Sequence, residues 1–203
     1  REAQLAAPSS ADASAHGGKP SFKTHAALPE VTCAVVAVAS GDGIAELFGN
    51  LGVHGVVTGG QTLNPSTQEL LDAVEHMNAQ QVVILPNNKN IIPVAKQVDG
   101  LTKKEVRVVP TCSMPEALAA LVAYDPEASA EHNGSAMAKA AAAALLKHIV
   151  TDDRELLTVI AGVDAKTAVT EQIVAWVGEQ FPSIACEVHR GGQPLYPYLF
   201  GVE

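Results

Sequence analysis

Four short apolar runs, each followed by a helical stretch, recur between residues 31 and 125. The runs lie at 33–39 (CAVVAVA), 53–57 (VHGVV), 81–85 (QVVIL) and 105–109 (EVRVV). A continuous apolar run of this length is typical of a strand that is covered on both faces. Strands that alternate with helices build parallel sheets in layered folds. The sequence therefore predicts an α/β lobe over residues 31–125, with a mostly parallel sheet flanked by helices.

Capping residues set the expected helix boundaries in this lobe. Ser66 or Thr67 is suited to cap a helix that runs to about Asn78, with Glu69 in its first turn. Further helices are expected up to about residue 51, over about 88–97, and from about 115 onward, where a proline stands near the first turn.

Three further segments flank this lobe. Residues 1–30 are rich in Ala, Ser, Gly and Pro and are typical of a linker. Residues 126–154 contain a strong helix former, AMAKAAAAALLKHIV, which we expect to bridge two lobes. Residues 155–203 repeat the strand–helix pattern, with strands at 156–162 and 184–190, a helix at 166–181 and a final strand. We expect a smaller C-terminal α/β lobe that closes with a hairpin.

The composition of the chain excludes several classes of protein. Apolar residues make up 47% and charged residues 17%, with 22 acidic against 13 basic side chains. This composition is typical of a packed domain. The net charge of −9 disfavours nucleic acid as a partner, because the acidic surface repels phosphates. No apolar run is long enough to span a membrane.

Cysteine and histidine usage disfavours disulfides and metal. The chain has three cysteines, Cys33, Cys112 and Cys186, and no CxxC motif. An odd number of cysteines makes a disulfide framework unlikely, which fits a reducing compartment. The seven histidines show no HxH or HExxH spacing, so no metal site is predicted. We expect a cytoplasmic protein and, because the chain begins at Arg1, a piece of a longer one.

The loops after the four predicted strands are polar or rich in glycine. They are Ser40–Gly43, Thr58–Ser66, Asn87–Asn90 and Thr111–Ser113. In parallel α/β sheets, ligands bind beyond the carboxyl ends of the strands, where such loops lie side by side. Carboxamides, hydroxyls and helix N-terminal N–H groups would converge there with one cation, Lys89. The sequence therefore predicts a site for an anion or a polar group.

The same loops also have structural interpretations. Residues 40–43 fit a tight turn, and residues 58–66 fit a loop with an Asn-Pro turn and a helix cap. Asn88 alone would suffice as a helix N-cap. If Asn87 and Lys89 are exposed recognition groups, changing both to Ala should leave the melting temperature nearly unchanged.

Motifs for phosphate transfer or covalent catalysis are absent from the sequence. It contains no P-loop, nucleophile elbow, kinase loop set or carboxylate cluster for Mg²⁺. Cys112 is interpreted as a small packing residue, because no base is tied to it by spacing. We therefore expect no cofactor in this chain and no activity of the chain alone.

The chain ends on a concentrated aromatic segment, HRGGQPLYPYLF. Alternation along a strand places Tyr196 and Tyr198 on one face, which Phe200 continues. Pro197 suits an edge strand because it lacks a backbone donor. The segment, with Gln193 at its start, either seals the core of the second lobe, which we favour, or contacts another chain.

Five segments are long and specific enough to compare with known families. They are VVAVASGDGIAELFGNLGV, VVTGGQTLNPSTQELLDAV, VVILPNNKNIIPVAKQV, AYDPEAS and EVHRGGQPLYPYLFGVE. Together they resemble the C-terminal region of the dihydroxyacetone-kinase-like subunit of bacterial fatty-acid kinase, over about residues 33–131 and 155–203. The resemblance implies ATP and Mg²⁺ in an N-terminal kinase domain of the full-length protein. It also implies a fold related to DegV-like fatty-acid-binding proteins, which carry the acyl chain that the kinase phosphorylates.

The resemblance carries over three clusters of motif residues as surface or binding residues. They are Asn87, Asn88, Lys89 and Asn90; Gly59, Gly60, Gln61, Asn64, Pro65 and Ser66; and Gly191, Gly192, Gln193, Pro194, Tyr196 and Tyr198. Ser40 and Thr111 join them as candidates from the strand-end loops. The family usually has a strand-rich stretch between DPEAS and the last α/β unit, where this chain has a short alanine-rich segment.

These inferences favour an accessory domain of a fatty-acid kinase. It would dock a DegV-like fatty-acid-binding protein so that the kinase domain, which is not in this chain, can phosphorylate the acyl carboxylate. Two alternatives remain open. One is a small-molecule or anion-binding domain that uses the strand-end loops, and the other is a structural dimerisation module that forms a homodimer.

Overall fold

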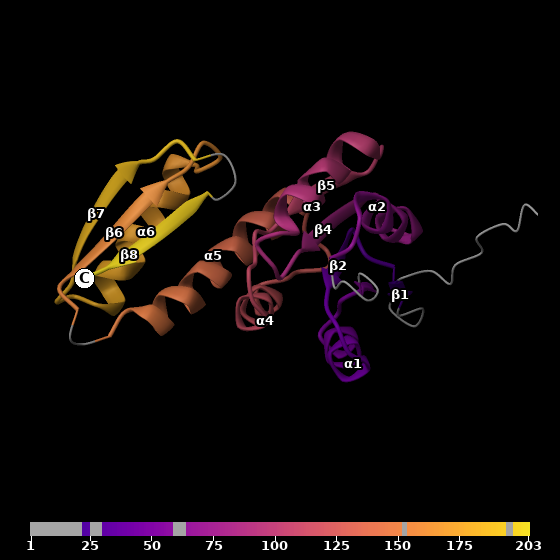
Figure 1. Cartoon of the computed structure of the whole chain (residues 1–203), viewed down its shortest axis with the longest axis horizontal. Coiled ribbons are helices and arrows are strands. Elements are labelled where there is room, and N and C mark those ends of the chain that lie inside the picture. The colour runs from indigo at the N-terminus through magenta and orange to yellow at the C-terminus, as the bar shows by residue number, and fades with distance from the viewer. Residues whose placement is uncertain (1–21, 25–29, 59–63, 152–153, 194–196) are drawn as a thin grey trace, which may run out of the picture.

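The computed structural model describes residues 22–24, 30–58, 64–151, 154–193 and 197–203. Within these ranges the chain forms two lobes joined by one long helix (Figure 1). The described strands of the first lobe lie in the order β1-β3-β2-β4-β5, and those of the second lie in the order β7-β6-β8. The α/β fold class predicted from the sequence is confirmed.

The first sheet is mostly parallel. Its strands are β1 (Phe22–Thr24), β2 (Cys33–Val38), β3 (Gly55–Val57), β4 (Gln81–Leu85) and β5 (Glu105–Val108). β1 alone runs antiparallel, along β3, and the sequence analysis missed it inside the stretch interpreted as a linker. All six residues of β2 are buried, as expected for a strand with a layer on each face.

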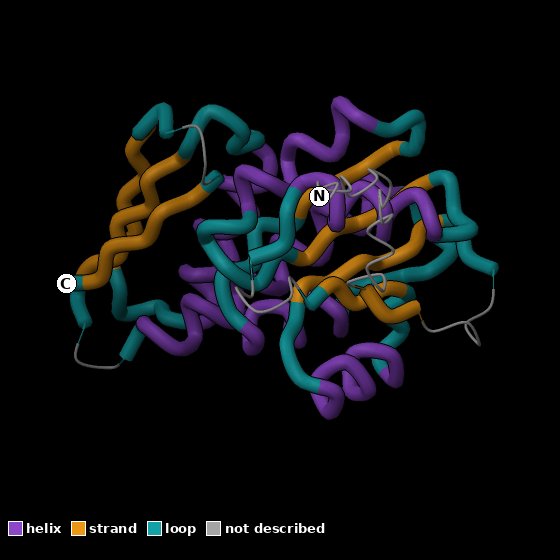
Figure 2. The backbone as a smooth tube through the Cα atoms, turned by 45° about the vertical axis from the view of Figure 1, so that its right-hand side comes forward, coloured by secondary structure: helices purple, strands orange, loops and turns teal. Residues whose placement is uncertain are grey.

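Helices cover both faces of this sheet (Figure 2). One face packs against α1 (Asp42–Asn50), α4 (Met114–Val122) and the first half of α5 (Ala130–Ile149). The other face packs against α2 (Thr67–His76) and α3 (Ile92–Val98), which a short 3-10 helix, η2 (Asp99–Leu101), follows. The period-2 alternation of β2 divides its side chains between the two layers.

Two helix starts test the capping predictions. Ser66 caps α2, and with Glu69 it forms a capping box, because each side chain accepts from the other residue's backbone N–H. α3 begins at Ile92 rather than near Asn88, so the prediction for its start is wrong. The residues in between form a turn in which the Ile91 N–H donates to the Asn88 carbonyl at 3.0 Å.

The second sheet contains β6 (Leu156–Ala161), β7 (Ala185–Arg190) and β8 (Tyr198–Val202), with α6 (Thr167–Gln180) between β6 and β7. β6 pairs in parallel with β7 and antiparallel with β8. The predicted hairpin between β7 and β8 is therefore wrong.

The residues directly after β7, Gly191 to Gln193, account for this strand order, because they lie over the end of β6. The Gly191 N–H donates to the Ala161 carbonyl at 2.9 Å, and the Val163 N–H donates to the Gln193 carbonyl at 3.0 Å. A β-carbon on Gly191 would lie 2.3 Å from Ile160 Cγ2, so only glycine fits this close approach.

The helix α5 belongs to the cores of both lobes. Met137 is buried in the first core, whereas Leu146 and the capping residue Val150 are buried in the second. Near the start of α5, buried Asn133 accepts from the Asp125 N–H and donates to the Asp125 carbonyl, which fixes the preceding turn. Among the described helices, none is long and apolar enough to cross a membrane.

Candidate functional site

The structure gathers three of the predicted loops at the carboxyl edge of the first sheet. β2, β4 and β5 are neighbours, so the residues that follow them lie together. Ser40 is exposed beyond β2, residues 87–90 follow β4, and Thr111 is buried beyond β5. The strand pattern predicts this grouping together with the loop after β3, of which residues 59–63 lie outside the described residues.

Asn87 and Thr111 fasten the ends of these three strands. The Asn87 Nδ2 group donates to the Val38 carbonyl at 2.9 Å, and the Thr111 hydroxyl donates to Asn87 Oδ1 at 2.6 Å. The Asn87 N–H in turn donates to the Thr111 hydroxyl at 3.2 Å. Asn87 has a φ of 57°, in the left-handed region that Asn tolerates better than most residues. Its carboxamide therefore has a structural role.

The rest of the Asn87–Asn90 loop points outward. Asn88 Oδ1 accepts from the Asn90 N–H at 2.9 Å, so it closes a turn instead of capping α3. Lys89 and Asn90 are exposed. Asn88 and Lys89 line a large cleft, which links this loop to the second lobe.

The other predicted site residues come from the loop after β3, which is a parallel neighbour of β2, and from the second lobe. Asn64 is exposed and Ser66 caps α2, both after β3. Gln193 lies in the second lobe, where its Nε2 group donates to the Ile160 carbonyl at 3.0 Å. Five predicted site residues lie outside the described residues, namely Gly59, Gly60, Gln61, Pro194 and Tyr196.

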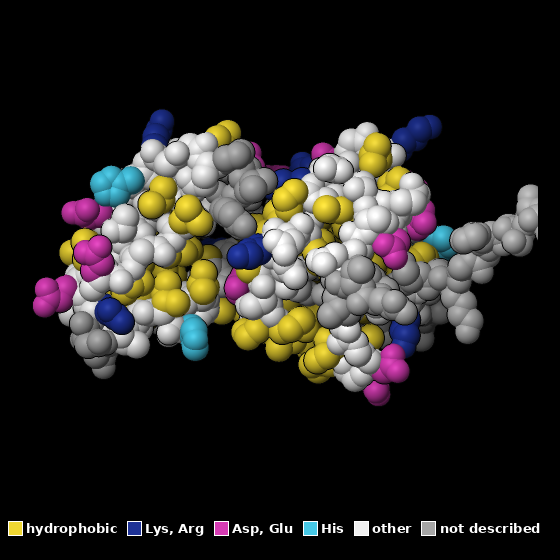
Figure 3. Space-filling model, in the orientation of Figure 1, with side chains coloured by type: hydrophobic (Ala, Val, Ile, Leu, Met, Phe, Trp, Pro, Cys, Tyr) yellow, Lys and Arg dark blue, Asp and Glu magenta, His cyan; other side chains and the backbone are white. Residues whose placement is uncertain are grey.

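The cleft lies between the two lobes and has a volume of about 1190 Å³. The first lobe contributes α3, β5 and the loops after β4 and β5, and the second contributes α6 and β8. α5 connects the two walls, because residues 134–149 of this helix line the cleft between them. Figure 3 shows hydrophobic side chains on both sides of the hollow, with charged groups between them.

A carboxylate held by two cations marks the polar end of the cleft. Arg107 of β5 donates through Nε to Glu131 Oε2 at 2.8 Å, and Lys166, just before α6, donates to Glu131 Oε1. These hydrogen bonds, from Lys166 and then Arg107, lower the pKa of Glu131 to about 2. The site joins one cation from each lobe to the start of α5.

Close packing positions Arg107 at this end. A β-carbon on Gly134 of α5 would lie 3.3 Å from the Arg107 β-carbon, so the glycine lets the helix backbone approach β5. A second charged link crosses the cleft nearby, where Lys96 of α3 donates to Asp164 Oδ2 at 2.8 Å. Both links are at least partly exposed to solvent.

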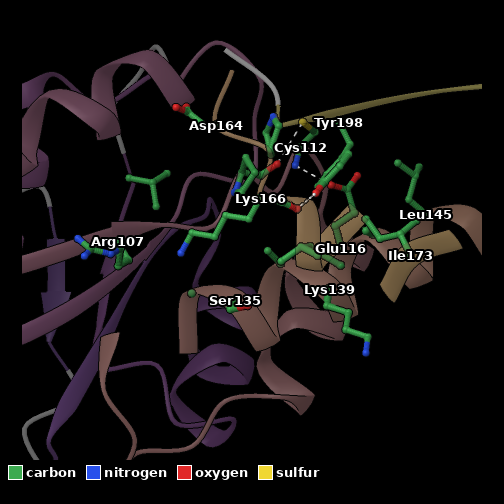
Figure 4. Close-up of a pocket in the computed structure, with 18 of the residues that line it drawn as sticks. Arg107, Cys112, Glu116, Ser135, Lys139, Leu145, Asp164, Lys166, Ile173 and Tyr198 are labelled. Atoms are coloured by element: carbon green, nitrogen blue, oxygen red, sulfur yellow. Dashed lines mark hydrogen bonds between the residues drawn. The ribbon is translucent and has the colours of Figure 1, made fainter. Parts of the chain in front are cut away.

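The opposite end of the cleft is apolar. Its wall consists of side chains from the end of α5, the start of α6 and β8, namely Leu145, Ile149, Val169, Ile173 and Phe200. Figure 4 shows Arg107 and Lys166 on one side and Leu145 and Ile173 on the other. Tyr198 stands between the two ends, with its hydroxyl 2.9 Å from Thr170 Oγ1 and 3.3 Å from the Lys166 carbonyl.

Sequence reasoning missed this polar end. Arg107 and Glu131 are 24 residues apart, and Glu131 and Lys166 are 35 apart, so no motif connects them. The one available signal was the basic residue inside the apolar run EVRVV.

Cys112 lies at the cleft, contrary to the prediction that it is a packing residue. It is exposed, and its backbone N–H donates to Glu116 Oε2 at 3.0 Å. Partial burial and then the Glu116 charge raise the pKa of its thiol, which disfavours the reactive thiolate. Among the described residues, no group of three or more His, Cys, Asp or Glu side chains could hold a metal ion.

The family model for the C-terminal region of FakA-like fatty acid kinase proteins matches residues 34–144 and 138–203. An uncharacterized protein of Staphylococcus aureus strain MRSA252 is 33% identical, over 93% of this chain and 41% of the relative. An uncharacterized protein of Staphylococcus haemolyticus is 34% identical, over 85% of this chain and 40% of the relative.

The curated relatives are longer than this chain, and one of them also has additional residues within the aligned region. The chain spans about two fifths of the length of the curated relatives it matches. The alignment with the Staphylococcus aureus protein runs over 233 residues but includes only 93% of this 203-residue chain, so the relative has internal residues without a counterpart here. The two family matches meet at residues 138–144, inside α5. The family model covers both lobes, and the chain belongs to the FakA-like C-terminal family of fatty acid kinase proteins.

Proposed function

We propose that this chain is the C-terminal accessory domain of a fatty acid kinase and that it docks a DegV-like fatty-acid-binding protein. Docking presents the acyl carboxylate of that partner to an ATP- and Mg²⁺-binding domain elsewhere in the full-length protein. The observation that carries the proposal is the family match over both lobes. The reaction belongs in the cytoplasm, where ATP is available.

The exposed carboxyl edge of the first sheet is the docking surface that we favour. Ser40, Lys89 and Asn90 are exposed there, while Asn87 and Thr111 hold the underlying strand ends in place. A rigid edge with exposed polar groups can recognise a partner without refolding. Lys89 supplies positive charge in a chain whose net charge is −9.

The test is a titration of the purified chain with a DegV-like protein loaded with fatty acid. Lys89→Ala combined with Asn90→Ala should weaken binding by about tenfold, or about 1.4 kcal/mol. Lys103→Ala is the matched control, because this exposed lysine precedes β5 at the opposite edge of the sheet, and it should bind normally.

A second titration, with MgATP, separates docking from catalysis. The isolated chain should give no heat beyond dilution and should transfer no phosphate. Sub-millimolar ATP binding would contradict an accessory role. If the Lys89, Asn90 double variant binds the partner as well as the Lys103 variant does, the docking surface does not lie at this edge.

A further inference from the structure

The polar end of the cleft already works as a carboxylate site. Glu131 is its resident carboxylate, and Arg107 and Lys166 approach it from the two lobes. The side chains of Lys166 and Glu131 are 65% and 49% exposed. Because exposed ion pairs of this kind contribute at most about 1 kcal/mol, an incoming anion can take the place of Glu131.

The other end of the cleft offers an apolar surface to the same ligand. Val169 lies on the first turn of α6 next to Lys166, and Ile173 follows one turn later. Leu145 faces them from α5. The volume of about 1190 Å³ exceeds the roughly 300–1,000 Å³ of common small-molecule sites, which leaves room for a long chain.

The charge of the lining favours a ligand with a single negative charge. The cations that line the cleft are Lys89, Lys96, Arg107, Lys139 and Lys166. The acids are Asp99, Glu116, Glu131 and Asp164, which leaves an excess of one positive charge. A nucleoside triphosphate carries several negative charges, which the four carboxylates would repel. A head group with one negative charge only has to displace the carboxylate of Glu131.

We propose that this cleft binds the acyl chain of an anionic single-chain lipid, with the head group between Arg107 and Lys166 and the tail against Val169, Ile173 and Leu145. The choice of an acyl anion rests on the proposed function, but binding is a property of this chain alone. The accessory domain thus holds an acyl group itself, in addition to docking a carrier.

The two family matches overlap in the part of α5 that lines the cleft. The matches meet at residues 138–144, and four residues of that range line the cleft, namely Ala138, Lys139, Ala141 and Ala142. The alignment shows that a relative has internal residues with no counterpart in this chain.

The single tryptophan of the chain provides a direct readout. Trp176 of α6 lines a small hollow with Ile173 and Lys139, and both of these residues also line the cleft. A tail in the cleft therefore lies one side chain away from the indole. The probe is dibromostearate, whose bromine atoms quench nearby tryptophan, with unbrominated stearate as the blank.

Four variants test the two ends of the site. Glu131→Gln removes the competing carboxylate and should tighten dibromostearate binding about threefold, and Lys166→Met should weaken it about three- to fivefold, as exposed charge pairs allow. Val169→Asp should weaken binding about tenfold, because it places a charge in the tail path. Val169 is only partly buried against the second core, and an acidic residue suits the third position of a helix, so the variant should keep the fold with a lower melting temperature. Lys103→Met, at the far edge of the first sheet, should change nothing.

Competition experiments identify the head group that the cleft prefers. Together with partner binding, they also distinguish failure of this inference from failure of the proposed function. Stearate, stearoyl phosphate and lysophosphatidate each compete in a separate arm, which identifies the head group, while stearyl alcohol should compete at least fivefold less well. Quenching that is equal for acid and alcohol, or equal in all four variants, would overturn the proposal. A chain that docks the DegV-like partner but shows no quenching refutes this inference and leaves the proposed function standing.

Discussion

At the scale of single residues, Asn87 and Lys89 differ in role although they are two positions apart. The Asn87 carboxamide bonds to the end of β2 and to buried Thr111, whereas Lys89 is exposed. Asn87→Ala should therefore lower the free energy of unfolding by about 1–3 kcal/mol, because buried partners lose their hydrogen bonds. Lys89→Ala should stay within about 0.5 kcal/mol of the parent. Urea denaturation of both variants measures the difference.

A third variant separates the two contributions at this position. Asn87→Gly keeps a backbone that accepts a φ of 57° but still loses the side-chain bonds. It should be nearly as unstable as Asn87→Ala. If Asn87→Ala and Lys89→Ala have the same melting temperature, the Asn87 side chain does not stabilise the fold, and its recognition role inferred from the sequence is supported instead.

The sequence pattern predicted the position of Lys89 in the candidate site but not the cluster of charged residues at its polar end. Lys89 was predictable, because parallel strands place their following loops at one edge. The meeting of Arg107, Glu131 and Lys166 was not, because it depends on how α5 packs against β5 and on how the second lobe sits. No local pattern in the sequence encodes either packing.

At the scale of elements, β8 is the strand that closes the second lobe. Tyr198, Phe200 and Val202 pack against its core, whereas Leu199 on the opposite face is 43% exposed. Phe200→Ala should therefore cost about 2 kcal/mol, below the roughly 3–5 kcal/mol of a fully buried Phe. The measurement is a thermal melt followed by the fluorescence of Trp176.

Leu199→Ala is the matched control for this strand, because it removes an apolar side chain from the exposed face. It should melt within a few degrees of the parent. Equal losses for the two variants would instead indicate that both faces of β8 are covered, as a contact with another chain would require.

Element positions were predictable to different degrees. β4 was predicted at its observed bounds because its apolar run is continuous and ends at a proline. The order β7-β6-β8 was not, because pairing depends on a close approach of Gly191 to β6 that the loop sequence does not reveal. β1 was missed because three residues inside a polar, small-residue stretch carry no readable period.

At the scale of the whole molecule, a titratable link joins the lobes. The folded pKa of Glu131 is about 2, below its ordinary value of 4.5, because Lys166 and Arg107 donate to it. A depressed carboxyl pKa stabilises the fold above the ordinary value, and this contribution is lost as the pH falls toward 2. The difference in unfolding free energy between parent and Glu131→Gln should therefore be constant above about pH 5 and shrink between pH 4.5 and 2.

Salt provides the independent check on this link. Half-exposed ion pairs are screened as ionic strength rises, so the difference at pH 7 should be smaller in 1 M salt than in 0.05 M salt. If the difference in unfolding free energy depends on neither pH nor salt, the effect of Glu131 comes from packing and not from its charge.

The shared helix also makes the length of the chain a geometric parameter. Met137 is buried in one core and Leu146 in the other. An α-helix turns by about 100° and rises about 1.5 Å per residue. Deleting one residue between these two anchors would swing the second lobe by about a quarter of a circle and carry Lys166 away from Glu131. Only insertions close to whole turns would keep the same faces opposed, so spacing within α5 is constrained even where its alanines are interchangeable.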